Sequence, residues 1–301
     1  MAATAARGKR GKPLVGFIGQ GWIGKAYSDN FEERGYRVIR YSLEKPWIKN
    51  KDKIRDCDIV FIAVWTPTTP QGFDSSVIES VLPLVGEGKI AVIKSTVLPG
   101  TTERLQKKFP KITILFGPEF LSIKSSVHDA AHPFANLIGM PMNDTKHFLA
   151  AERVMKTLPR APLTEICKSA EAEIFKYTHN ASGYTQVILF NIMYDVALKF
   201  GADWDVINHA IQADPLISKR YSNPVHKGGR GAGGGCFIKD IAALRMHYKK
   251  HLPEDREGLR VLEAMEAKNI ELLMRTDKDI DLLTSVYGAS ALKKKKGKKR
   301  R

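Results

Sequence analysis

The fold of this chain is decided by residues 14–24, which read LVGFIGQGWIG. The apolar run predicts a buried strand, and helical spacing continues after the glycines to about Arg34. Between them, Gly19, Gly21 and Gly24 form the pattern Gly-x-Gly-x-x-Gly. In a strand–turn–helix unit these glycines permit the tight turn, the approach of a pyrophosphate and close packing of helix on strand. The stretch therefore predicts a dinucleotide-binding turn with phosphates at the helix N-terminus, and a glycine turn without a ligand is the alternative.

Strand patterns continue beyond this turn. The apolar runs that predict strands lie at 36–41, 58–64, 90–93, 112–116 and 136–139, with a helical pattern at 76–84. Strands that alternate with helices imply βαβ units and a parallel sheet. We therefore expect an α/β Rossmann-type domain with a mostly parallel sheet over residues 13–165.

The pattern becomes helical after about residue 165. Residues 169–200 contain no proline and are mostly helical in spacing, and Gly201 follows as a C-terminal stop. Helical patterns return at 240–250 and 256–275. We expect an all-α domain built on one long central helix over residues 166–292.

The charge of the chain is concentrated at its ends. Of the 301 residues, 27% are charged and 43% hydrophobic, which suits a globular core, and the net charge is +16. Residues 1–12 and 293–301 carry much of that excess, so we expect a basic disordered N-terminus and a Lys/Arg-rich tail that binds polyanions weakly. The body between them is only mildly basic, which argues against a dedicated nucleic-acid function.

The sequence also predicts a location. No run approaches 18 apolar residues, so no membrane span is expected, and residues 1–12 lack the apolar segment of a secretory signal. The three cysteines include no Cys-x-x-Cys pair, which argues against a disulfide framework or a structural zinc site. We expect a cytoplasmic protein without a metal site.

One cysteine stands in a distinctive segment, residues 231–240, which read GAGGGCFIKD. A cysteine that follows glycines at a helix start has its thiolate favoured by nearby N–H groups. If residues 236–240 form a helical turn, Cys236 and Asp240 share a face, which places a nucleophile beside a carboxylate. The alternative is a small buried cysteine.

The second strand of a dinucleotide-binding unit normally ends in an acid that binds the ribose hydroxyls. That position is Ser42, with Glu44 two residues later and Arg40 and Lys45 nearby. A small residue with basic neighbours could instead accept the 2′-phosphate of NADP. We expect NAD, and NADP stays open.

The thiol segment resembles the GFGGSCFPKD segment of the UDP-glucose/GDP-mannose dehydrogenase family. Four further stretches are similar to family motifs in the same order: Val64-Trp65-Thr66-Pro67-Thr68 to VPTPT, Lys94-Ser95-Thr96-Val97 with Pro99-Gly100-Thr101 to KSTV…GT, Gly117-Pro118-Glu119-Phe120-Leu121 to NPEFL, and Lys176-x-x-x-Asn180 to K-x-x-x-N. With the glycine turn, the resemblance covers about residues 13–275.

The resemblance implies NAD-dependent oxidation of a sugar-nucleotide C6 alcohol to a carboxylate, through a thiohemiacetal and a thioester on Cys236. It implies that Lys176 stabilises the oxyanion and that Asn180 binds that oxygen or the water. Asp240 would orient or activate the water, and Glu119 would transfer protons in thioester hydrolysis. Thr96 would lie near the nicotinamide. The implied cofactor contacts are Gly19, Gly21, Trp22, Ile23, Gly24, Ser42, Thr66, Thr68, Ser95 and Thr96.

A homodimer is also expected. In the family the long central helices pack across a two-fold axis. The apolar residues 187–190 and 192 almost encircle the corresponding helix of this chain, which suits burial on more than one side.

The chain departs from the family pattern in several places. We expect no counterpart of the family's third, nucleotide-gripping domain. Ile123, Ala135 and Leu216 stand where family motifs have an acid and two arginines. These departures concern the substrate more than the chemistry. Two alternatives therefore stay open: a β-hydroxyacid dehydrogenase-like oxidoreductase, and a non-catalytic dinucleotide-binding or scaffold protein.

Overall fold

The computed structural model describes residues 11–290 and 292. The basic segments at 1–12 and 293–301 lie outside these residues, except for Gly11 and Lys12. The described chain forms two compact units. The first takes the chain up to Thr66 together with Ser75–Ile174, and the second takes Pro67–Asp74 and the chain from Phe175 onward. Among the described helices, none is long and apolar enough to cross a bilayer.

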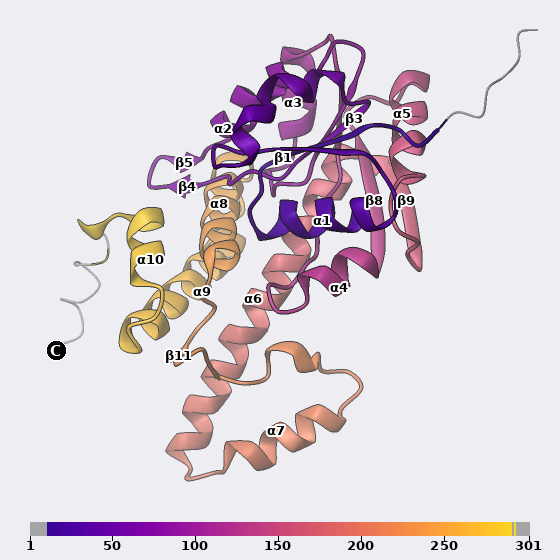
Figure 1. The fold of residues 1–301 in the computed structure, drawn as a ribbon. Coiled ribbons are helices and arrows are strands. Elements are labelled where there is room, and N and C mark those ends of the chain that lie inside the picture. The colour runs from indigo at the N-terminus through magenta and orange to yellow at the C-terminus, as the bar shows by residue number, and fades with distance from the viewer. Residues whose placement is uncertain (1–10, 291, 293–301) are drawn as a thin grey trace, which may run out of the picture. The chain divides into compact units, whose positions relative to one another are not determined.

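The first unit is built on a seven-stranded sheet (Figure 1). Its strands, in spatial order, are β2 (Val38–Tyr41), β1 (Val15–Ile18), β3 (Ile59–Ile62), β6 (Ile90–Ile93), β7 (Thr113–Phe116), β8 (Ala135–Met140) and β9 (Leu163–Lys168). All neighbours pair in parallel except β7 with β8. The expected Rossmann-type sheet, mostly parallel, is therefore confirmed.

Helices connect these strands. They are α1 (Trp22–Glu33), η1 (Trp47–Asp56), α2 (Ser76–Val81), η2 (Leu82–Leu84), α3 (Thr101–Lys108), α4 (Ser126–Ala131) and α5 (Thr145–Met155). Figure 1 shows α1 and α4 side by side in this unit. The parallel pairings require such crossovers, because a parallel neighbour cannot be reached by a tight hairpin.

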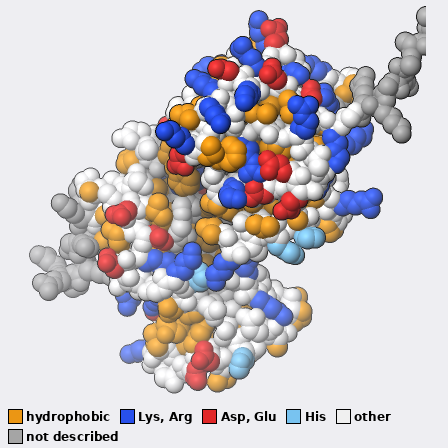
Figure 2. All heavy atoms as spheres, in the orientation of Figure 1, with side chains coloured by type: hydrophobic (Ala, Val, Ile, Leu, Met, Phe, Trp, Pro, Cys, Tyr) orange, Lys and Arg blue, Asp and Glu red, His pale blue; other side chains and the backbone are white. Residues whose placement is uncertain are grey.

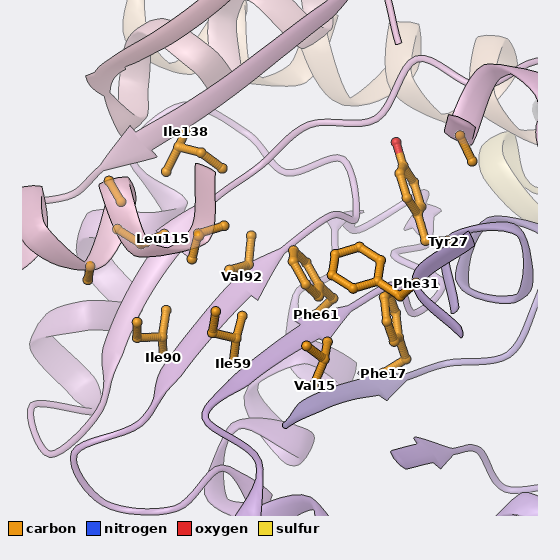
Figure 3. Packing of buried hydrophobic residues seen from close by; sticks show 14 of the residues in the cluster. Val15, Phe17, Tyr27, Phe31, Ile59, Phe61, Ile90, Val92, Leu115 and Ile138 are labelled. Carbon is orange, nitrogen blue, oxygen red and sulfur yellow. The ribbon is translucent and has the colours of Figure 1, made fainter. Parts of the chain in front are cut away.

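An aromatic cluster joins α1 to the sheet (Figure 3). Phe17 of β1 stacks on Phe61 of β3 with ring centroids 5.1 Å apart, and Phe31 of α1 meets the edge of Phe17 at 5.4 Å. All three side chains are buried. Residues two apart on a strand share a face, so Val15 and Ile59 extend the same cluster. This packing holds the later half of α1 against β1 and β3, the two strands whose carboxyl ends lie beside the glycine turn.

A buried carboxylate of the long helix α6 (Ser169–Lys199) caps α3 within the first unit. Glu173 accepts hydrogen bonds from the N–H of Gly100 at 2.7 Å and from the N–H and hydroxyl of Thr102 at 2.9 and 2.6 Å. Its side chain is fully buried. Burial raises the pKa of Glu173 to about 7, although the three donors oppose that shift.

Glu173 predicts a dependence of stability on pH. A carboxyl group whose folded pKa lies near 7, above its ordinary 4.5, contributes stability that is complete below pH 4.5 and is lost as pH rises through 7. We expect the free energy of unfolding of the wild type, relative to Glu173→Gln, to fall by about 3 kcal/mol between pH 4.5 and pH 8. Urea unfolding of both proteins at several pH values measures this difference, and a difference that does not vary with pH would contradict the assignment.

The second unit is mainly helical. Besides the rest of α6 it contains α7 (Trp204–Ala213), η3 (Lys219–Tyr221), α8 (Gly235–His251), α9 (Arg256–Arg275) and α10 (Ile280–Tyr287). Two short hairpins accompany them, β4 (Thr68–Thr69) with β5 (Gly72–Phe73) and β10 (Val225–His226) with β11 (Gly229–Arg230). A long helix followed by further helices confirms the expected all-α character, to which the hairpins are an addition.

Three helices of this unit share one apolar core. Ile238 of α8, Leu273 of α9 and Leu283 of α10 are buried in a single cluster. Figure 1 shows α8, α9 and α10 side by side. The hairpin β4–β5 packs against α8, and β4 also packs against α10.

The later part of α6 has both buried and exposed apolar side chains. Ile188 and Phe190 are buried, whereas Leu189 and Ile192 are exposed. Figure 2 shows hydrophobic side chains gathered over the end of α6 nearest α7. A single copy of the chain therefore buries only some of the apolar side chains around this helix and leaves the others exposed.

Candidate active site

The glycine turn of the first unit is shaped by very close backbone packing. Gly19 follows β1 with φ +91°, and a Cβ there would lie 2.2 Å from the carbonyl oxygen of Ala63. A Cβ on Gly24 would lie 1.9 Å from the carbonyl oxygen of Gly19. Real side chains do not fit such spaces, so the first and third glycines are required by the fold. Gly21 differs, because a Cβ there meets nothing within 4 Å.

The turn leaves the start of α1 without a side-chain cap. Gly21 is the N-cap residue and supplies no side-chain acceptor, and the first turn of the helix contains no acidic residue. The N–H groups of that turn, with the open space at Gly21, suit a pyrophosphate. The implied contacts Trp22 and Ile23 form the first residues of this helix. The residues present therefore fit the phosphates of a dinucleotide.

Two hydroxyl groups join the loops that follow β3 and β6. Ser95 Oγ accepts a hydrogen bond from the N–H of Val64 at 3.0 Å and donates to the carbonyl oxygen of Val64 at 2.7 Å. Thr66 Oγ1 donates to the carbonyl oxygen of Thr96 at 3.0 Å. The carboxyl ends of parallel strands form the ligand-binding edge of such a sheet. The structure thus places Ser95, Thr96 and Thr66 together at this edge.

Glu119 lies in the loop after β7, at the same edge. It is almost fully buried, and its Oε2 accepts a hydrogen bond from the N–H of Leu121 at 2.9 Å. The Lys94 ammonium, also buried, donates to the carbonyl oxygens of Gly117 at 3.0 Å and Pro118 at 3.4 Å. Lys94 therefore fixes the backbone that leads into Glu119. The sequence resemblance included Lys94 in a motif but assigned it no role, and the structure shows which carbonyl groups it binds.

The end of β2 carries no acid. Ser42 Oγ accepts a hydrogen bond from the N–H of Glu44 at 3.3 Å, as in a local turn. The nearby Arg40 is buried, and its guanidinium binds Asp29 at 2.7 Å and both carboxylate oxygens of Glu32. The positive charge of Arg40 is therefore compensated by these two carboxylates within the protein. Arg40 is thus not available to bind a 2′-phosphate at Ser42.

The second unit holds a buried polar cluster. Lys176 and Asn180 lie one turn apart on α6, and both are buried. Asn180 Nδ2 donates to Asp240 Oδ2 at 2.7 Å, and the Lys239 ammonium binds Asp240 Oδ1 at 2.5 Å. Only 1% of Asp240 is exposed, so its charge depends on these partners. Sequence reasoning missed Lys239, although it stands beside Asp240 in the segment quoted for its cysteine.

Cys236 lies in the first turn of α8, four residues before Asp240, and is exposed. The alternative of a small buried cysteine is therefore wrong. The other two cysteines differ from it. Cys57 is buried and Cys167 is half-buried, and burial raises the pKa of their thiols to about 12 and about 11. Within the described residues Cys236 is the one exposed thiol.

The candidate residues divide between the units. The glycine turn, Ser42, Thr66, Ser95, Thr96 and Glu119 belong to the first, and Lys176, Asn180, Cys236 and Asp240 belong to the second. Thr68 also belongs to the second unit, where β4 packs on α8 and α10. Its hydroxyl is buried and has no hydrogen-bond partner among the described atoms.

The positions that depart from the family pattern are all described. Ala135 is buried at the start of β8, whereas Ile123 and Leu216 are exposed. Leu216 is the most open of the three, with 92% of its surface accessible. Nothing within either unit requires these three replacements.

Comparison with protein families gives two matches. Residues 47–158 match the model described as UDP-glucose/GDP-mannose dehydrogenase family, NAD binding domain. Residues 170–270 match the model described as UDP-glucose/GDP-mannose dehydrogenase family, central domain. Together the two matches cover most of the chain and both of its units.

Individual relatives point the same way. The chain is similar to UDP-glucose 6-dehydrogenase of Pseudomonas aeruginosa, with 30% identity over 74% of this chain and 51% of that protein. It is also similar to UDP-glucose 6-dehydrogenase TuaD of Bacillus subtilis, with 28% identity over 78% of this chain and 51% of that protein. The chain thus spans about half the length of these curated relatives.

Solved structures show the same fold. A UDP-glucose dehydrogenase of Pyrobaculum islandicum superposes with a TM-score of 0.72 at 24% identity, over 91% of this chain and 73% of that chain. A 3-hydroxyisobutyrate dehydrogenase of Mycobacterium tuberculosis gives 0.66 at 14% identity, over 91% of this chain and 98% of that chain. The two-part architecture is therefore shared between enzymes of different named substrates.

Proposed function

Because the chain belongs to the UDP-glucose/GDP-mannose dehydrogenase family, we propose that it oxidises the C6 alcohol of a sugar nucleotide to a carboxylate. The cofactor of the family's first domain is NAD, which supplies a hydride acceptor for each of the two oxidations when bound. The observation that carries the proposal is the buried trio of Asn180, Asp240 and Lys239 on the helices that bear Lys176 and Cys236.

Cys236 is the proposed nucleophile. Its sulfur forms a bond to the aldehyde carbon that the first oxidation produces, and the proton that leaves the thiol is balanced by the one that the carbonyl oxygen takes up, which gives a thiohemiacetal. Loss of the second hydride and of the hydroxyl proton converts this adduct to a thioester. Water then breaks the carbon–sulfur bond, which releases the sugar acid and restores the thiol. Covalent capture holds the reactive aldehyde until it is oxidised.

The polar residues of the second unit are assigned to the oxygen atoms of these intermediates. Lys176 offers a buried positive charge to the oxyanion, and Asn180 offers its amide to the same oxygen or to water. Asp240 orients the water that attacks the thioester. The Lys239 ammonium and the Asn180 amide hold the two Asp240 oxygens, and so fix its direction.

The first unit contributes the remaining proposed groups. Glu119 is assigned proton transfer during thioester hydrolysis, because it is a buried carboxylate at the carboxyl edge of the sheet. Thr96 at that edge is assigned to the neighbourhood of the nicotinamide. The glycine turn is assigned to the pyrophosphate, with Gly21 at the point of closest approach.

The protein is further proposed to act as a homodimer in the cytoplasm. Exposed Leu189, Ile192, Met193 and Val196 on α6 leave apolar surface that a second copy would cover. The Lys/Arg-rich tail is proposed to bind polyanions weakly, in a salt-dependent way.

A screen for NAD reduction tests the function. Purified protein is incubated with NAD and either UDP-glucose, GDP-mannose or their N-acetylated relatives, and absorbance at the NADH band is followed. The proposal expects turnover with one nucleotide sugar and none with free sugars. Turnover of small β-hydroxy acids instead, with insensitivity to thiol blocking, would favour the alternative oxidoreductase. No turnover, together with NAD binding, would favour a scaffold.

Ser42 gives a prediction on cofactor affinity. Ser42→Asp supplies the carboxylate that binds the ribose hydroxyls, so the Kd for NAD should fall by about tenfold, and that for NADP should rise by more. Ser42→Asn is the matched control, because it has nearly the same shape without the charge. Isothermal titration with both cofactors measures the effect, and equal affinities in the two variants would contradict the placement of the ribose.

A further inference from the structure

The loop that leads into Cys236 is held through its backbone by residues of the α9–α10 region. We call residues 229–234 the thiol loop, and Asn269, Thr276, Lys278 and Asp279 the clamp. Asn269 binds both backbone groups of Ala232, accepting from its N–H at 2.7 Å and donating to its carbonyl oxygen at 3.0 Å. Asn269 is itself buried. This paired contact fixes the loop in both position and orientation.

The turn between α9 and α10 supplies the other contacts. Thr276 Oγ1 accepts from the N–H of Arg230 at 3.0 Å, and Asp279 Oδ2 accepts from the N–H of Gly234 at 2.8 Å. The Lys278 ammonium donates to the carbonyl oxygen of Gly231 at 3.0 Å. Gly234 is the N-cap residue of α8, so the contact with Asp279 lies directly before the turn that carries Cys236.

The glycines of the thiol loop match this clamp. A Cβ on Gly233 would lie 2.1 Å from Asp279 Oδ2, and one on Gly231 would lie 2.9 Å from Asn269 Oδ1. A Cβ on Gly229 would lie 2.8 Å from Thr276 Oγ1. The loop is therefore rich in glycine partly because the clamp side chains approach its backbone closely.

The turn that carries Asp279 also has an uncommon backbone. Asp277 and Asp279 have φ of +52° and +54°, a region that side chains other than glycine adopt at a cost. The apolar face of α10, with Leu283 and Val286, packs with Ile238 of α8 and keeps this turn in place. Packing of α10 on α8 thus maintains a backbone that directs Asp279 at the thiol loop.

We propose that the clamp, and Asp279 above all, is the device that positions the Cys236 thiol for attack. The inference rests on the proposed function, in which Cys236 is the nucleophile. Asp279 acts through the backbone of Gly234 and is a positioning residue. Removing its acceptor loosens the start of α8, so that the sulfur spends less time at the reacting carbon and loses the helix N–H groups that favour its thiolate.

The key variant is Asp279→Gly, because glycine adopts φ +54° without strain while the acceptor is lost. We expect kcat to fall about tenfold, as for a small displacement of a reacting group, with the KM for NAD and the thermal midpoint unchanged. Hydrogen exchange at the Gly234 amide should become faster. Asp279→Asn, which keeps an acceptor and tolerates this φ, should stay close to wild type.

Two further variants separate positioning from general damage. Asp277→Gly is the matched control: it lies in the same turn, has the same backbone region, and makes no hydrogen bond to the thiol loop within the described chain. It should leave kcat and exchange unchanged. Gly233→Ala displaces the Asp279 carboxylate and should reproduce Asp279→Gly, and the double variant should be no worse than either single one.

The outcomes distinguish this proposal from the proposed function. Wild-type kcat in Asp279→Gly, or unchanged exchange at Gly234, overturns the clamp. If the wild type oxidises no nucleotide sugar, the proposed function fails. The clamp is then tested by the rate at which iodoacetamide alkylates Cys236 in each variant. A slower rate in Asp279→Gly than in Asp277→Gly supports the clamp, and equal rates overturn it.

Discussion

Replacing Cys236 with serine should stop formation of the sugar acid. Without the thiol no thioester forms, so the overall rate should fall by at least about a thousandfold, the scale of losing a covalent nucleophile. The thermal midpoint should stay that of the wild type, because Cys236 is exposed and no apolar contact of the core is lost. Product analysis by mass spectrometry, rather than NADH alone, measures the loss of acid.

The control for this variant is Cys167→Ser. Cys167 is half-buried, and burial raises the pKa of its thiol to about 11, so little thiolate is present at neutral pH. That variant should form acid at the wild-type rate. Normal acid formation in Cys236→Ser would show that the oxidation proceeds without sulfur, and would leave only the shared fold as the basis of the proposal.

The second large effect concerns the glycine turn. Gly21→Ala should fold normally, because φ at Gly21 is −64° and a Cβ there meets nothing within 4 Å. The added methyl group occupies the space where a pyrophosphate would approach the backbone. We expect the Kd for NAD to rise by roughly 30-fold or more, equivalent to about 2 kcal/mol. Fluorescence titration with NADH measures the loss of affinity, and thermal unfolding checks that the variant folds normally.

Gly19→Ala provides the contrast. Its φ is +91° and the new Cβ would lie 2.2 Å from the Ala63 carbonyl oxygen, so this variant should lose several kcal/mol of stability before any ligand is added. Binding of NAD by Gly21→Ala at wild-type affinity would show that the cofactor does not lie against this turn.

The sheet was predictable where its strands are apolar. The apolar runs around β1, β3 and β6 are continuous and buried. The glycines after β1 form a pattern that is typical of a dinucleotide-binding turn. The strand β9 was missed, since Leu163–Lys168 is largely polar and exposed at the sheet edge. The reversal between β7 and β8 was also missed, because strand direction depends on the connecting chain and not on the strand's own composition.

The site was predictable residue by residue but not as a network. Motif resemblance named Asn180 and Asp240, and it did not say that one donates to the other or that Lys239 holds the second oxygen. The clamp was not predicted either. Asn269 belongs to a helix of ordinary composition and Asp279 to the turn after that helix, and their role depends on tertiary contacts with a loop that lies far from them in sequence.

For Thr68, the order of motifs in the sequence did not predict the unit to which the residue belongs. It was expected beside Thr66 as a cofactor contact, yet the chain passes from one unit to the other between them. Its assignment to the cofactor therefore stays a prediction. The domain boundary near residue 165 likewise stays a prediction, and the compact units divide within α6, between Ile174 and Phe175.

The stoichiometry of the reaction tests the central claim most directly. A limiting amount of the nucleotide sugar that the screen identifies is run to completion with excess NAD, and NADH and sugar acid are quantified together. Oxidation of an alcohol through a cysteine thioester predicts two NADH and one acid for each sugar consumed. One NADH with a released aldehyde or ketone, or no consumption of any nucleotide sugar, would contradict it.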